Sequence, residues 1–270
     1  MRKEDFTYIQ FKILSRKESV LELSKKILAV INELGKHNYE KKNVKYLGDQ
    51  YIQNEITSSE IHNYLTKKQE DTTIFSNKTK EFNLFITEEI CGDEIYDCLW
   101  FSFNALIPGF PKIPDLKSLL NLLKSLFISF KGIYAYTEDE EILQVYFAQR
   151  SYDKILSQLP FDYINFLPKP DLDFTNHFNI PSHFSTNEMN ISEAPNGFWW
   201  INFLSKKQIE NLNLNSTIND WHHTEVINDE YTLYVLTDTI LNLNNKEHLL
   251  KLQNLIHKTD LITIQEKSII

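Results

Sequence analysis

The chain has 270 residues, of which 42% are hydrophobic and 13% aromatic, and its formal net charge is −9 at pH 7. This much apolar surface supports a folded core and excludes global disorder. An acidic chain repels phosphate backbones, so the composition disfavours nucleic-acid binding. It suits either plain solubility or a basic protein partner that is met through charge complementarity.

The two cysteines, Cys91 and Cys98, are too few for a disulfide scaffold, and their spacing matches no common metal motif. We interpret them as free thiols of a reducing compartment. No stretch of the sequence reaches the roughly 18 apolar residues of a membrane span, and the first residues lack the apolar run of a secretory signal. We therefore expect a cytoplasmic protein without a membrane partner.

The first elements that the pattern predicts are a strand and a helix. Apolar and polar residues alternate over residues 6–14, as in a half-buried strand. Ser15 and Glu18, three positions apart, have the pattern of a capping box and predict that a helix begins there. Gly35 is expected to end this helix. Between them, apolar residues recur at helical spacing at Val20, Leu23, Ile27, Val30, Ile31 and Leu34.

The centre of the chain predicts a long hairpin followed by a helix. Residues 82–86 alternate as a strand, residues 90–97 resemble a turn around Gly92, and the apolar run 98–106 predicts a central strand. A proline-rich loop follows, after which Asp115 is expected to cap a helix over residues 116–130. Shorter segments are predicted as strands within 44–51 and 133–136, and residues 61–65 as helical or extended.

An acidic run follows the short strand at 133–136. It consists of Glu138, Asp139, Glu140 and Glu141, and it leads into residues 142–149. Acidic residues in a first helical turn interact favourably with the helix dipole, which is the simpler interpretation. A surface patch that meets a partner is the alternative.

Residues 159–195 predict an ordered connector, because they contain five prolines and many aromatic residues but little periodicity. They separate an N-terminal half, 1–158, from a C-terminal half, 196–270, of one compact unit. The second half predicts strands at 198–204, 221–227 and 231–236 and helices at 206–212 and 246–257, with a tight turn at Asn228-Asp229 and a cap at Asn244 or Asn245. Strands mixed with packed helices in two dissimilar halves predict an α+β fold with antiparallel or mixed sheets.

No established catalytic motif is present in the sequence. It has no Gly-x-Ser-x-Gly elbow, and none of its six glycines forms a phosphate-binding loop. Adjacent strand residues point to opposite faces, so His222 and His223 rarely share a metal, whereas His223 and Glu225 share a face. A hydrolase or metal-dependent enzyme built on these three residues is the alternative function. Surface histidines of a strand are the simpler interpretation.

Two adjacent tryptophans, Trp199 and Trp200, follow Gly197 within an apolar run that predicts a buried strand. We interpret all three residues as structural rather than as a platform for a sugar or a base. At least one of the two indoles is expected to be buried, and a strand buried on both faces would bury both.

Three stretches resemble the immunity protein 52 family of bacterial polymorphic-toxin and type VI secretion systems. They are the junction Ser15-Arg16-Lys17-Glu18-Ser19, the run Leu99-Trp100-Phe101-Ser102-Phe103-Asn104, and Gly197-Phe198-Trp199-Trp200-Ile201-Asn202 with the elements that follow it. The resemblance implies an immunity protein that binds and neutralises a cognate toxin protein in the cytoplasm, with no catalysed reaction, cofactor or metal. In such pairs an acidic inhibitor often meets a basic toxin, commonly a nuclease. The exposed acidic candidates for contact are Asp93, Glu94 and residues 138–141.

Reversal of the four charges at Glu138, Asp139, Glu140 and Glu141 tests the acidic run as a contact surface. We expect toxin association to slow by about tenfold at low salt, because electrostatic steering is lost, while the fold is retained. Stopped-flow kinetics measures the rate, and circular dichroism checks the fold. Unchanged kinetics at low salt would remove this run from consideration.

Overall fold

The computed structural model describes residues 8–37, 45–46, 56–67, 73–76, 82–91, 93–104, 115–138, 190–215, 220–241, 245–261 and 264. The chain groups into two compact units, the first made of residues 1–89 and 95–135 and the second of residues 90–94 and 136–270. The predicted halves, 1–158 and 196–270, stay a prediction, because residues 139–189 lie outside the described part of the chain.

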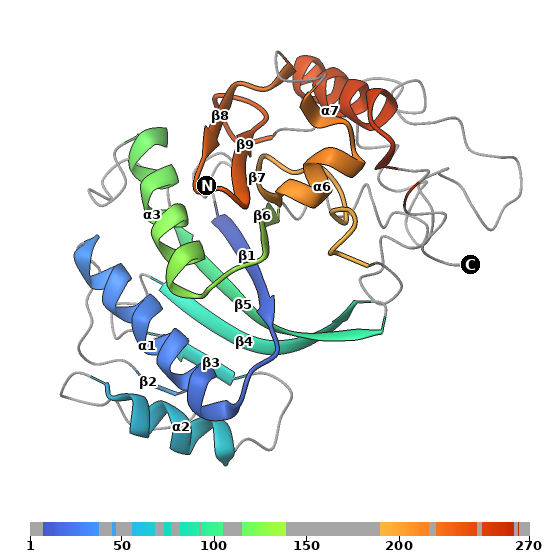
Figure 1. Ribbon diagram of the computed structural model, residues 1–270. Helices are drawn as coiled ribbons and strands as arrows, with labels where there is room; N and C mark the ends of the chain where they lie inside the picture. The colour runs from blue at the N-terminus through green and yellow to red at the C-terminus, as the bar shows by residue number, and fades with distance from the viewer. Residues whose placement is uncertain are drawn as a thin grey trace, which may run out of the picture. The chain divides into compact units, whose positions relative to one another are not determined.

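Strands and helices together confirm the predicted α+β fold (Figure 1). The first unit has the strand order β2-β3-β4-β5-β1. The pairs β1–β5, β2–β3 and β3–β4 are antiparallel. Its elements are β1 (Tyr8–Arg16), α1 (Val20–Lys36), β2 (Lys45–Tyr46), α2 (Ser58–Thr66), β3 (Thr73–Ser76), β4 (Phe82–Cys91), β5 (Glu94–Asn104), α3 (Leu116–Ser129) and the start of β6 (Tyr134–Glu138).

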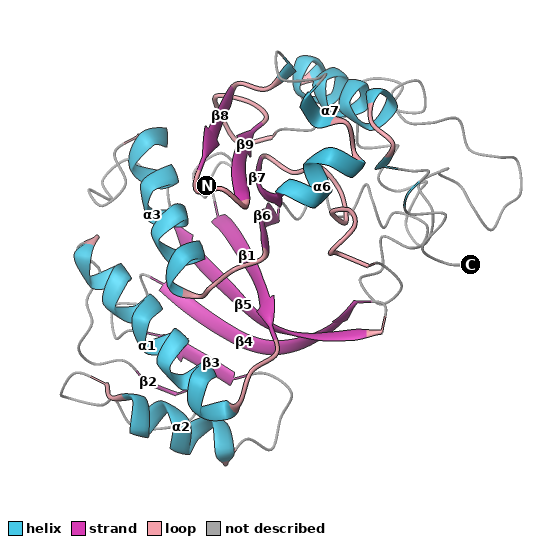
Figure 2. Ribbon diagram, viewed as in Figure 1, coloured by secondary structure: helices cyan, strands magenta, loops and turns pink. Residues whose placement is uncertain are grey.

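The helices of the first unit lie together on one face of its strands (Figure 2). Helix α1 packs against both α2 and α3. Five of the six apolar positions predicted for α1 are buried, and Val20 at its start is the exposed exception. Asp115 caps α3 as predicted, since its side chain accepts a hydrogen bond from the Ser118 amide at 2.7 Å. No helix among the described residues is both long and apolar enough to cross a membrane.

The junction between β1 and α1 differs from the prediction. Strand β1 continues through Ser15 to Arg16, because its ladder with β5 extends that far. The helix therefore begins at Val20, and Ser19 is its N-cap. The predicted capping box of Ser15 and Glu18 is wrong. Gly35 lies inside the last turn rather than beyond it. Sheet pairing, which is a tertiary interaction, here outweighs a local capping signal.

A buried ionic cluster occupies the place that the capping box was predicted to fill. The Asp97 side chain is 0% exposed, accepts a hydrogen bond from the Glu18 amide at 3.1 Å and lies 3.1 Å from Lys17 Nζ. The buried Lys26 ammonium donates to Ser15 Oγ at 3.0 Å and pairs with the Glu18 carboxylate at 3.0 Å. Burial alone would lower the pKa of Lys17, but the Glu88 and Asp97 carboxylates outweigh it and raise the pKa. These contacts fix the entry into α1.

The hairpin of β4 and β5 has a tighter connection than predicted. Residues 90–91 belong to β4 and residues 94–97 to β5, so the turn is narrower than the expected 90–97. Strand β5 includes residues predicted as turn, because its pairing with β1 extends to the Arg16–Tyr96 pair. Cys91 and Cys98 are both buried and free. Burial raises the pKa of the Cys98 thiol to about 12, so this thiol is not a nucleophile at neutral pH.

The second unit contains β7 (Ile201–Ser205), α6 (Lys206–Asn211), β8 (His223–Val226), β9 (Tyr231–Val235) and α7 (Lys246–Lys258). Its strand order includes β7-β9-β8, with both pairings antiparallel. The predicted hairpin of the last two strands is confirmed. Asn245 caps α7, as one of the two predicted candidates, by accepting from the Glu247 amide at 3.0 Å.

The two tryptophans precede strand β7 instead of lying within it. The Asn202 side chain accepts a hydrogen bond from the Trp199 amide at 3.0 Å and donates one to the Trp199 carbonyl at 2.7 Å, which holds the chain in a turn. Trp199 and Trp200 are 1% and 2% exposed, and Gly197 is also buried. Their indole N–H groups donate to the Asn196 side chain and to the Thr237 carbonyl. The indoles thus belong to the core of the second unit.

Replacement of Asp97 tests the ionic cluster. We expect Asp97→Ala to lower the free energy of unfolding by about 2–4 kcal/mol, because it removes a fully buried carboxylate that accepts from the part-buried Glu18 amide and pairs with Lys17. Glu88→Ala is the matched control, since this exposed carboxylate pairs with the same Lys17 at 2.7 Å, and its loss should cost below about 1 kcal/mol. Denaturant unfolding measures both, and equal losses would contradict the special role of Asp97.

Replacement of Asn202 tests the turn that precedes β7. Asn202→Ala leaves two buried backbone groups of Trp199 without partners, so we expect a loss of about 2–5 kcal/mol in the free energy of unfolding. Asn228 also bonds two backbone groups, but at the surface, where water replaces them. Asn228→Ala should therefore cost about 1 kcal/mol or less. A thermal or denaturant melt in which Asn202→Ala resembles this control would contradict the assignment.

Candidate partner-binding groove

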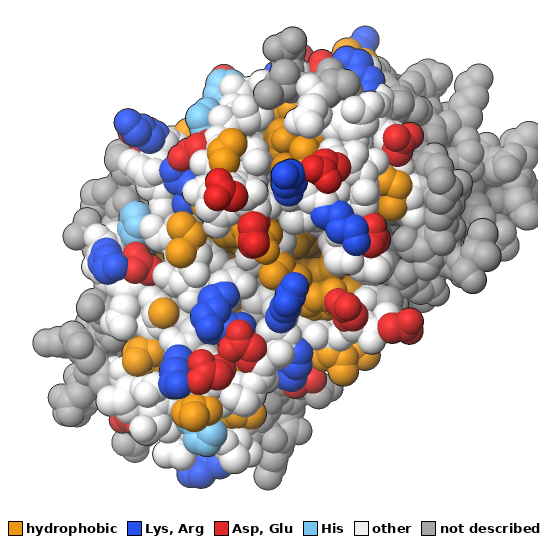
Figure 3. Space-filling model, in the orientation of Figure 1, with side chains coloured by type: hydrophobic (Ala, Val, Ile, Leu, Met, Phe, Trp, Pro, Cys, Tyr) orange, Lys and Arg blue, Asp and Glu red, His pale blue; other side chains and the backbone are white. Residues whose placement is uncertain are grey.

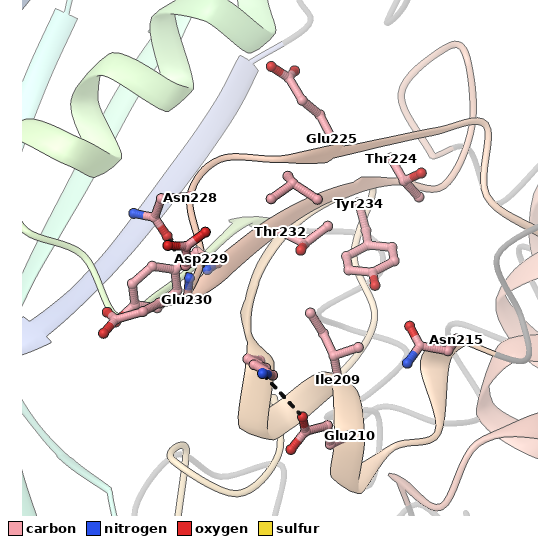
Figure 4. Close-up of a pocket in the computed structure, with 13 residues that line it drawn as sticks. Ile209, Glu210, Asn215, Thr224, Glu225, Asn228, Asp229, Glu230, Thr232 and Tyr234 are labelled. Carbon is pink, nitrogen blue, oxygen red and sulfur yellow. Dashed lines mark hydrogen bonds and ion pairs between the residues drawn. The ribbon is translucent and has the colours of Figure 1, made fainter.

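An open groove of about 340 Å³ lies between helix α6 and the β8–β9 hairpin of the second unit (Figure 4). Both walls are described parts of one compact unit. The helix supplies Lys206, Ile209 and Glu210, the following turn supplies Asn215, and the hairpin supplies residues 224–226 and 228–232 together with Tyr234. The groove therefore combines aliphatic, aromatic and acidic side chains within reach of solvent.

The hairpin register selects the side chains that face the groove. Thr224 pairs with Tyr234 and Val226 pairs with Thr232, so these four residues share one face of the sheet. Figure 4 shows Tyr234 pointing from β9 toward α6, from which Ile209 points back. Side chains alternate between the two faces of a strand, so Glu225 lies on the other face and points away from α6.

Local hydrogen bonds hold the hairpin turn and the start of α6 in place. The Asn228 side chain accepts hydrogen bonds from the amides of Glu230 and Tyr231, at 2.9 and 3.0 Å, which closes the turn. Helix α6 begins at a capping box formed by Ser205 and Gln208. The Lys206 amide then donates to the Glu230 carbonyl at 2.7 Å, so the start of the helix is tied directly to the turn.

Tyr234 forms the inner end of the groove and is only 4% exposed. Its ring lies 4.9 Å from that of Trp221, which in turn packs edge-on against Phe198. Among the described residues, none forms a hydrogen bond with the Tyr234 hydroxyl. Burial raises the pKa of this hydroxyl, so it is protonated at neutral pH and can both donate and accept.

The charge around the groove is predominantly negative. Its residues include four carboxylates and one ammonium, and that ammonium, on Lys206, already lies 4.0 Å from the Glu210 carboxylate. Asp229 and Glu230 are exposed at the turn, and within the described residues neither side chain has a cationic partner. On the face drawn in Figure 3, acidic and basic side chains of the described residues are interspersed.

The residues proposed from sequence lie in different parts of the chain. Asp93 and Glu94 are exposed at the tip of the β4–β5 hairpin, and Glu138 is the last residue of β6. Asp139, Glu140 and Glu141 lie outside the described residues. No contact among these acidic candidates is established, and their role in partner binding stays a prediction.

The histidine stretch brings together only one pair of the expected side chains. His223 Nε2 lies 3.6 Å from the Glu225 carboxylate, on the shared face that the alternation predicts, and both side chains are exposed. His222 is exposed next to them. Among the residues that the structure describes, no three ligand-type side chains converge so as to hold a metal ion. An enzyme at this stretch would need a further ligand or reacting group.

Sequence reasoning missed the residues that give the groove its character. These are Tyr234, Val226 and the two carboxylates Asp229 and Glu230. The predicted turn at Asn228-Asp229 placed the carboxylates at the surface, which was an available signal. Nothing in the sequence placed α6 against this hairpin, because that contact joins segments that are separated along the chain.

No model of a known protein family matches the chain, and no curated protein sequence matches it at a significant level. Among solved structures, the chain is similar to the Pseudomonas aeruginosa T6SS protein PA0821, with a TM-score of 0.44 and 10% identity over 92% of this chain and 72% of that one. It is also similar to the duplicated taurocyamine kinase of Schistosoma mansoni, with a TM-score of 0.26 and 14% identity over 93% of this chain and 32% of the kinase. Similarities at this level carry no inference about function.

Proposed function

We propose that the protein is an immunity protein, which binds a cognate bacterial toxin domain and neutralises it by stoichiometric protein–protein contact. The observation that supports this most is the acidic groove, where Asp229 and Glu230 have no described cationic partner beside an open, partly apolar surface. In this proposal the partner is a basic effector, a nuclease being the class that the sequence resemblance implies. The protein acts in the cytoplasm, catalyses no reaction and needs no cofactor.

Charge supports the proposal at two scales. The net charge of −9 attracts a basic protein from a distance and raises its association rate at low ionic strength. Close to the surface, the carboxylates at the turn can pair with lysine or arginine, while Val226 and Ile209 offer apolar area to the stems of the same side chains. An interface core with apolar area and a charged rim is typical of protein–protein recognition.

Co-expression with a toxin domain, sought among the products of the neighbouring genes, tests the proposed function. We expect the chain to restore growth of cells that produce the toxin, and to form a complex of equal stoichiometry with it in size-exclusion chromatography. If cells are not protected and no complex forms, the proposal fails.

A charge-reversal pair locates the contact. Asp229→Lys/Glu230→Lys should slow association by about tenfold at low salt, and the difference should shrink at high salt as the charges are screened. Asp238→Lys/Asp260→Lys makes the same change in net charge at two exposed residues that do not line the groove. If both variants slow association equally, only net charge matters and the groove is not the contact surface.

A further inference from the structure

Among the described residues, no strand pairs with the outer edge of β8. The Leu236 amide donates to the Trp200 carbonyl at 2.8 Å on the β7 side of β9, and the Ile227 amide donates to the Tyr231 carbonyl at 2.9 Å on the β8 side. Hydrogen-bonded pairs alternate along an antiparallel ladder, so Glu225 and His223 bond β9. Thr224 and Val226 therefore turn their N–H and C=O groups toward the open edge, and β8 is the last strand in the order.

This edge lacks two of the usual protections against strand pairing. The segment His223–Val226 contains no proline and no lysine. Val226 is 71% exposed, the highest value among the exposed large hydrophobic residues of the described chain. Glu225 is the single carboxylate of the strand, on the face away from α6. An exposed apolar residue on an open edge is an aggregation hazard unless a partner covers it.

A second, independent feature is the Tyr234 hydroxyl beside this edge, on a side chain that is otherwise buried. The side chain of Tyr234 points into the groove, and the described residues give its hydroxyl no partner (Figure 4). This hydroxyl therefore offers a donor and an acceptor to a bound side chain at the inner end of the groove. A strand paired with β8 would direct every second side chain toward the α6 face, where this hydroxyl lies.

We propose that β8 accepts an extended segment of the partner as an added strand, and that this segment places an arginine or lysine side chain in the groove. The aliphatic stem packs on Val226 and Ile209, and the cationic end donates to the Tyr234 hydroxyl and reaches the Glu210 carboxylate. The turn carboxylates, Asp229 and Glu230, pair with the next basic residue. The identity of the partner as a toxin rests on the proposed function, whereas the strand-binding site is argued from the edge and the groove alone.

A second copy of this chain fits the edge poorly. Two β8 strands paired antiparallel about Glu225 would place the two Glu225 carboxylates opposite each other, which is unfavourable. The charge of −9 on each copy adds to this repulsion. Charge complementarity therefore favours a basic segment of a different protein.

A peptide probe tests the site without the toxin. The probe is a short capped peptide in which valine alternates with arginine, and the control peptide alternates valine with glutamate. With the basic peptide we expect changed NMR amide shifts at Thr224 and Val226, and hydrogen exchange at these two amides slowed by at least about tenfold. Equal effects of the two peptides, or no effect of the basic one, would overturn the proposal.

Two variants of the full chain test whether the outward N–H of Val226 and the hydroxyl of Tyr234 bind the peptide. Val226→Pro removes an outward N–H without breaking the internal ladder, so it should weaken binding of the basic peptide about tenfold or more while the melting temperature is retained. Val226→Thr keeps this N–H and is the matched control, with binding within about threefold of the original chain. Tyr234→Phe should weaken binding about fivefold and leave the melting temperature unchanged or higher, because the lost hydroxyl has no internal partner.

The outcomes separate this proposal from the proposed function. If the peptide binds as expected but the chain does not neutralise the toxin, the immunity function fails and the strand-binding site stands. If the chain neutralises the toxin and Val226→Pro does so equally well, the function stands and the site is overturned as the toxin's contact. A dimer of the free chain that Val226→Pro dissociates, seen by analytical ultracentrifugation, would overturn the proposal in favour of self-association.

Discussion

The second unit depends on the two hydrogen bonds that join the Asn202 side chain to the backbone of Trp199. They turn the chain immediately before β7, which places both indoles in the core and lets the Trp200 carbonyl accept from Leu236. Strand β7 then positions β9, and β9 positions β8. Because α6 follows β7 directly, the same anchor also sets the second wall of the groove.

The first unit uses buried polar groups in the same way. Asp97 on β5 accepts from the backbone at the start of α1, and Lys26 on that helix returns to Ser15 on β1. In both units a polar side chain, rather than apolar packing alone, fixes where one element ends and the next begins. Such groups stabilise one arrangement because any other would leave them buried without partners. The Tyr234 hydroxyl differs, since it opens into a groove and no described residue forms a hydrogen bond with it.

The groove differs from the rest of the fold in the polar groups that it leaves open to a partner. Asp97 and Asn202 bond the backbone where the fold is built, whereas the Tyr234 hydroxyl, the outer edge of β8 and the turn carboxylates lie together at one surface of the second unit, where no described residue pairs with them. An exposed apolar residue on an open edge is an aggregation hazard that a bound segment would remove, and a basic segment would also pair with the hydroxyl and the carboxylates.

The sequence by itself determined the α+β class, the capped helices α3 and α7 and the β8–β9 hairpin, because caps, periodicity and turn residues act over a few neighbouring positions. It also predicted the excess of negative charge. Tertiary structure decided that Ser15 belongs to a strand and that the tryptophans precede β7, since ladder pairing and the Asn202 bonds involve partners outside those local patterns. It alone brought α6 beside the hairpin and so created the groove, because packing between separated segments leaves no periodic trace in a sequence.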